Sequence, residues 1–146
     1  MKTSRILALS AIALVGATAL TGCGTVEAML YKRTTMDFDD ATALATQWTG
    51  TPATWVPADS GGIRAMQSNM SGAEDASIAV LTKTALDPAL CTEVDRVSAP
   101  SYTFDDLPDP YRADRVLSCG EWTVMKTPDG WFGWTPGKEK EQVKAG

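Results

Sequence analysis

The first 22 residues constrain this chain most, because they separate a targeting segment from the part that folds. Lys2 and Arg5 give a positive start, and residues 6–20 then carry no charge. A positive start followed by a short apolar run is typical of a secretory signal. The run is shorter than the roughly 20 residues that a comfortable bilayer crossing needs. We therefore expect residues 1–22 to be a signal peptide, leaving 124 of the 146 residues as the exported protein.

The apolar run ends in Leu20-Thr21-Gly22-Cys23, which resembles the lipobox of bacterial lipoproteins. The resemblance implies that Cys23 is lipidated with a diacylglyceryl group of palmitate-type chains, and that a peptidase cuts just before it. Two such chains hold a protein stably at a membrane, whereas one does so only marginally. The expected location is the cell membrane, with the protein lipid-anchored on the extracytoplasmic face. The alternative is an uncleaved membrane helix whose cysteine is incidental.

Assigning Cys23 to the lipid leaves Cys91 and Cys119 as an even pair in an exported, oxidising setting. Such a pair predicts a disulfide. Two free thiols or a metal site are the alternatives. Two cysteines in a chain without histidine supply too few of the usual metal ligands. We therefore expect neither a metal nor a cofactor.

The net charge of the exported part limits the classes of partner that it can bind. Removing residues 1–22 takes away Lys2 and Arg5 and no acidic residue, so the net charge of −5 becomes −7. A chain this acidic, without a basic run, is a poor candidate for nucleic-acid binding. It gains nothing from an anionic lipid surface either, so the lipid has to do the anchoring. The absence of histidine also removes the commonest general base.

The clearest helix signal lies at residues 37–48, after an expected tether over residues 23–36. Asp37 can cap this helix, and Asp39 and Asp40 then fall in its first turn, where the helix dipole favours negative charge. Apolar residues follow helical spacing on one face, at Phe38, Ala41, Ala45 and Trp48, with Leu44 beside them. We expect this N-terminal helix to lie across a sheet.

Two hairpins are predicted further along. Residues 63–69 and 76–82 read as strands joined by a short polar link, and residues 121–127 and 131–135 flank Pro128-Asp129-Gly130. Residues 98–113 hold three prolines and should be irregular, and residues 138–146 form a charged flexible tail. The predicted fold is α+β: an N-terminal helix packed on a small antiparallel sheet of about four to five strands, closed by one disulfide. This domain should cover residues 37–137.

A second resemblance covers most of residues 52–137. It rests on Trp55-Val56-Pro57 with Ile63, on Cys119-Gly120-Glu121-Trp122-Thr123-Val124, and on Gly130-Trp131-Phe132-Gly133-Trp134-Thr135-Pro136-Gly137. These look like segments of small uncharacterised exported or membrane-anchored proteins of actinobacteria. The resemblance implies a fold and a location, and it transfers no catalytic residues.

Five tryptophans are an unusual number for one small domain. Aromatic side chains often anchor binding surfaces, so these residues are candidates for a binding site. Trp48 and Trp55 are expected in the core. In the last hairpin, Trp131 must point to the opposite face from Trp134, so one of the two faces is partly exposed. A possible binding surface therefore involves Trp131 or Trp134 together with Tyr111. The alternative is that all these rings only close a thin core.

The favoured function is a non-enzymatic binding or accessory lipoprotein of the cell envelope, with an envelope protein or peptide as a possible partner. No catalytic residue is named. A small cell-surface hydrolase using a carboxylate pair is the alternative, and an accessory lipoprotein without a discrete pocket is a third reading. The acidic residues nearest to such a pair read instead as a solvated loop, at Asp105, Asp106, Asp109 and Asp114.

Overall fold

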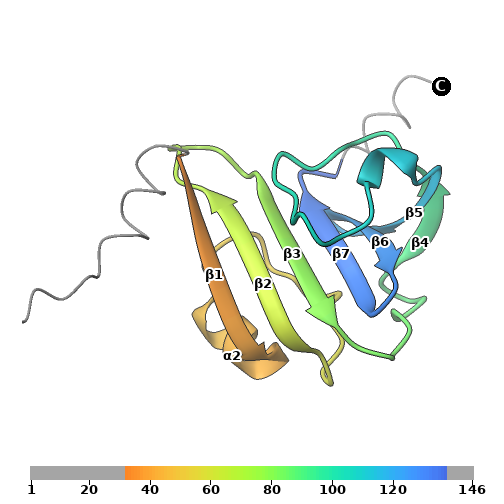
Figure 1. Ribbon diagram of the computed structural model, residues 1–146, viewed down its shortest axis with the longest axis horizontal. Helices are drawn as coiled ribbons and strands as arrows, with labels where there is room; N and C mark the ends of the chain where they lie inside the picture. Colours follow the sequence, from red (N-terminus) through yellow and green to blue (C-terminus); the bar gives the residue numbers. More distant parts are fainter. Residues whose placement is uncertain (1–31, 138–146) are drawn as a thin grey trace, which may run out of the picture.

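A computed structural model describes residues 32–137, which form a seven-stranded antiparallel sheet with one short α-helix and one 3-10 turn (Figure 1). In chain order the elements are β1 (Arg33–Asp40), α2 (Ala41–Gln47), β2 (Gly61–Ser68), β3 (Ala76–Leu81), β4 (Thr92–Asp95), η1 (Pro110–Arg112), β5 (Arg115–Cys119), β6 (Trp122–Thr127) and β7 (Gly130–Thr135). Across the sheet the strands lie in the order β1-β2-β3-β7-β6-β5-β4. The domain is mostly β, so the predicted sheet of four to five strands is too small.

Both predicted hairpins are present. β2 pairs antiparallel with β3, and β6 pairs antiparallel with β7 around a turn at residues 128–129. The two hairpins meet in the middle of the sheet, where Ile78 of β3 lies opposite Gly133 of β7. Residues 98–113 contain no strand and only the turn η1, as their prolines predict.

The prediction of a helix starting at Asp37 is wrong. Residues 33–40 form β1 instead, and α2 starts at Ala41 with Asp40 as its N-cap. The Asp40 carboxylate accepts a hydrogen bond from the Ala43 N–H at 2.8 Å, which is the role predicted for Asp37. Phe38 is buried from a strand position opposite Ile63, because ladder pairing with β2 outweighs the local helix signal.

β4 and β5 are the other strands that the sequence pattern did not predict. β4 is only four residues long and polar at three of them, and β5 carries Arg115 and Ser118 among its apolar residues. Cross-strand pairs stabilise these two strands although their sequences carry no clear strand pattern. Val94 lies opposite Val116, and Asp95 lies opposite Arg115.

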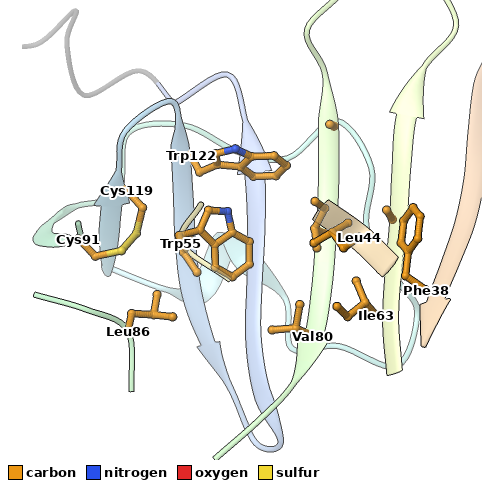
Figure 2. Close-up of a cluster of buried hydrophobic side chains, with 13 residues drawn as sticks. Phe38, Leu44, Trp55, Ile63, Val80, Leu86, Cys91, Cys119 and Trp122 are labelled. Carbon is orange, nitrogen blue, oxygen red and sulfur yellow. A yellow bond between two sulfur atoms is a disulfide. The ribbon is translucent and has the colours of Figure 1, made fainter. Parts of the chain in front are cut away.

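Each face of the sheet packs against a different layer. On one side, here called the helix face, α2 and two loops cover a core that contains the disulfide and the tilted pair Trp55–Trp122 (Figure 2). On the other side, the loop face, residues 96–113 cover a second core. Its buried members are Met66, Ala79, Phe104, Val116, Met125, Phe132 and Trp134.

The predicted disulfide is present. Cys91 and Cys119 are bonded, with their Cα atoms 4.3 Å apart and a separation of 28 positions in the sequence (Figure 2). The bond joins the residue just before β4 to the last residue of β5 and lies in the core of the helix face. It therefore links the two strands of the β4–β5 edge hairpin at their open end. The signal peptide, Cys23, residues 23–31 of the tether and the tail at 138–146 lie outside the described residues.

Candidate functional site

The structure places Trp131 and Trp134 on opposite faces of β7. Trp134 is fully buried on the loop face, where its Nε1 donates to the Ser98 hydroxyl at 3.0 Å. That hydroxyl also lies 3.1 Å from the Thr123 hydroxyl, so a small buried polar network fastens the loop to the sheet. Trp131 is half-buried on the helix face. Its Nε1 donates to the Thr84 carbonyl at 3.0 Å, and Lys126 Nζ lies 4.4 Å from its ring centre.

Tyr111 is exposed, with 63% of its side chain accessible, and it belongs to the turn η1. The guanidinium of Arg96 lies 5.6 Å from its ring centre and donates to the carbonyls of Ala113, Ser98 and Tyr111. Tyr111, Trp131 and Trp134 therefore occupy three separate environments. The structure does not bring them together into one binding surface.

A hollow lined by small and apolar side chains lies beside α2. It is a crevice of about 360 Å³ between the helix and the loop that follows it. The lining side chains are small or apolar: Ala41, Leu44, Ala45, Trp48, Gly50, Pro52, Ala53, Thr54 and Val56. We call this hollow the α2 crevice.

Hydrogen bonds to the backbone hold the loop wall of the α2 crevice in place. Trp48 Nε1 donates to the Thr51 carbonyl at 2.8 Å, and Trp122 Nε1 reaches from the core to the Pro52 carbonyl at 2.9 Å. Trp122 is 1% exposed, so this second bond connects the crevice wall to the buried core of the helix face. The crevice is therefore a pre-formed feature of the fold.

The chemistry available in the α2 crevice is that of apolar contact. None of its lining residues has an ionisable side chain, and polar groups come from Thr54 and the main chain. An aliphatic or aromatic group can displace water from such a site, and a few backbone groups can orient it. The lining therefore offers one side-chain hydroxyl, that of Thr54, and no carboxylate, amine, thiol or imidazole.

The sequence pattern did not single out these residues as a site. Ala41 and Ala45 fell on the predicted helix stripe, which was expected to face the sheet. In the structure the buried helix residue is Leu44, and the two alanines line the crevice. Their small size was the available signal, because a stripe that packs closely on a sheet usually carries larger side chains.

The acidic residues of the loop are exposed, and two of them, Asp106 and Asp109, make structural contacts. The Asp106 carboxylate accepts two hydrogen bonds from Arg64, at 2.7 and 2.9 Å, and Arg64 lies 4.5 Å from the Phe104 ring centre. This hydrogen-bonded guanidinium holds the pKa of Asp106 below its usual value. Asp109 caps η1 by accepting from the Tyr111 N–H. Within residues 32–137, no three carboxylates or cysteines gather as a metal site would require.

No protein-family model, curated protein or solved structure matches this chain. Among residues 32–137, no helix is long and apolar enough to cross a membrane. The lipobox resemblance at Leu20–Cys23 therefore stays a prediction from the sequence.

Proposed function

We propose that this protein is a lipid-anchored protein of the cell envelope that binds an apolar group of an envelope protein, peptide or small molecule in the α2 crevice. The observation that carries the binding role is the crevice itself: a pre-formed apolar hollow whose lining has no ionisable side chain. Its volume lies within the range of about 300–1,000 Å³ that is typical of ligand sites.

The proposed location rests on two features. The first is the order of segments in residues 1–23, where a positively charged start is followed by an apolar run and then by the lipobox motif. The second is the Cys91–Cys119 disulfide, because such bonds persist mainly in proteins that leave the reducing cytosol. The anchor implied by the lipobox would hold the binding domain close to the outer surface of the membrane.

Binding is favoured over the alternative, a hydrolase with a carboxylate pair, by electrostatics. A general acid needs a raised pKa to stay protonated near neutral pH. Hydrogen bonds from Thr84 and Thr82 lower the pKa of Asp59, and Arg64 lowers the pKa of Asp106. Both shifts favour the charged carboxylate, which is the opposite of what an acid catalyst needs.

The anchor is tested by replacing Cys23. We expect Cys23→Ala to move the protein from the membrane fraction to the soluble extracytoplasmic fraction, and the mass of the mature N-terminus to lose the acyl chains. Gly24→Ala lies just outside the four-residue motif and should stay in the membrane. A Cys23→Ala protein that stays in the membrane after residues 1–22 have been removed would contradict the lipid anchor.

The crevice is tested by photo-crosslinking in intact cells. A photo-reactive amino acid at Ala45, which lines the crevice, should give a discrete adduct with an envelope component. The same amino acid at Thr46, on the exposed side of α2 and outside the crevice lining, is the matched control. Equal labelling from both positions, or no adduct from Ala45, would contradict the binding role while leaving the anchor untouched.

A further inference from the structure

Strand β1 is the outer strand of the sheet, and within the described residues no strand lies on its other side (Figure 1). One hydrogen bond shows which residues of β1 bond to β2 and which direct their backbone groups outward. The Lys32 carbonyl accepts a hydrogen bond from the Asn69 N–H at 2.7 Å, so Lys32 faces β2. Antiparallel strands alternate between residues that bond inward and residues that bond outward. The outward-facing backbone groups of β1 therefore belong to positions 33, 35, 37 and 39.

Charge is segregated along this edge. Lys32 and Arg33 lie at the start of the strand, and Asp37, Asp39 and Asp40 lie at its end. Two copies of such a strand running antiparallel place the basic start of each against the acidic end of the other. The edge is thus complementary to itself.

The ladder phase and the charges together select one register. Outward-facing positions can pair only with outward-facing positions, so each register differs from the next by two residues. One register places Arg33 opposite Asp39, Thr35 opposite Asp37, and Met36 opposite Met36 on the two-fold axis. A shift in one direction opposes Asp37 to Asp37, which brings like charges together. A shift in the other direction still places Arg33 opposite Asp37, but it leaves Asp39 and Asp40 beyond the partner's Lys32 and Arg33, so fewer opposite charges meet.

The side chains fit this register. Met36 is partly buried against the core of the helix face, so a second Met36 across the axis would extend that apolar surface. Arg33 projects from the other face, with its guanidinium carbon 5.9 Å from the Tyr102 ring centre. In the dimer, the Arg33 side chain would turn from Tyr102 toward the outer edge to meet the carboxylate of the facing Asp39.

We propose that β1 pairs antiparallel with β1 of a second copy of this chain, about a two-fold axis at Met36, to form one continuous sheet across the dimer. The backbone ladder supplies the attraction, and two symmetry-related Arg33–Asp39 contacts set the register. Anchorage of both copies to one membrane would raise their effective concentration, so even a modest interface would be occupied. Acidic residues on an edge strand can also serve to prevent pairing, and the test separates these two roles.

The test uses the full chain in membranes and a cysteine on the proposed axis. Met36→Cys places two thiols at a non-hydrogen-bonded pair, where Cα atoms lie about 4.5 Å apart and a disulfide can form. With copper–phenanthroline as oxidant, we expect a dimer on a non-reducing gel. Thr34→Cys is the matched control. The two copies of position 34 would lie four residues apart along the strand, about 13 Å, which is too far for a bond.

Charge reversal then tests the register in the Met36→Cys background. Arg33→Asp or Asp39→Arg alone should lower the dimer about tenfold or more, because each creates two like-charge contacts. Combining both reversals restores opposite charges and should restore the cross-link. Asp105→Arg makes the same charge change on an exposed loop residue and should have no effect.

A separate variant tests the backbone ladder. Thr35→Pro removes an outward-facing N–H without removing a bond to β2, so it should abolish the dimer and leave the monomer folded. The proposal is overturned if Met36→Cys gives no dimer, if Thr34→Cys cross-links equally, or if the double reversal fails to restore pairing. It is also overturned if replacing the edge aspartates by asparagine increases the dimer, since they would then act as a barrier.

Discussion

At the scale of single residues, the contact between Gly133 and Trp55 shows how a glycine makes room for the core. The Trp55 indole lies close against Gly133 of β7, and a Cβ built on Gly133 would lie 2.6 Å from its Cζ2 atom. The missing side chain of Gly133 therefore lets a loop tryptophan lie directly on the sheet, next to Trp122. Trp55 has 3% of its side chain exposed as a result.

The substitution Gly133→Ala should destabilise the domain by about 1–3 kcal/mol, because an overpacked core has to shift a large ring. The measurement is urea unfolding followed by tryptophan fluorescence. Gly61→Ala is the matched control, since its Cβ would lie 3.5 Å from the Asp39 carbonyl, an ordinary contact. We expect it to change stability by no more than about 0.5 kcal/mol. Equal effects of the two substitutions would contradict this account of Trp55.

At the scale of elements, the sequence predicted the two hairpins well and the strand at the edge of the sheet poorly. The turn Pro128-Asp129-Gly130 is a local signal, and the pairing of β6 with β7 follows directly from it. The β1–α2 junction depends on pairing with β2, about 25 residues later in the chain, and local spacing carries no information about that partner. Phe38 fits a helical stripe and a strand face equally well, so its spacing alone could not decide. The α2 crevice was missed for the same reason, because it exists only after α2 is placed.

The position of the helix start can be tested with two aspartates. Asp40→Ala removes the acceptor of the Ala43 N–H and should cost about 1 kcal/mol of stability. Asp37→Ala removes an exposed strand side chain and should change stability by no more than about 0.5 kcal/mol. Thermal unfolding monitored by circular dichroism measures both. The reverse order of effects would restore Asp37 as the cap.

At the scale of the whole molecule, the two edges of the sheet are held in place in different ways. The disulfide secures β4 and β5 at one edge, whereas β1 at the other edge is held by its ladder with β2 and by α2. The two cores on either face join these halves through β3 and β7, whose side chains contribute to both. We expect the edge at β4–β5 to depend on the disulfide more than any other part of the sheet does.

Removing the disulfide should therefore be costly. The double substitution Cys91→Ala and Cys119→Ala should lower the free energy of unfolding by about 3–4 kcal/mol, because a loop of this length is no longer closed in the unfolded chain. The measurement is chemical unfolding compared with the unchanged protein under non-reducing conditions. Hydrogen exchange should show β4 and β5 losing protection first. Uniform loss across the sheet would argue against a local staple.

The position of β1 has a mechanical consequence under the proposed anchorage. The tether joins β1 at its start, and the α2 crevice lies at the end of the same strand, about 27 Å further along at 3.4 Å per residue. A ligand held in the crevice and pulled away from the membrane would load β1 along its own axis. Every bond between β1 and β2 would then share the force in shear, whereas a perpendicular pull would break them one after another. An outer strand in this geometry resists a pull along its own axis better than a pull across it.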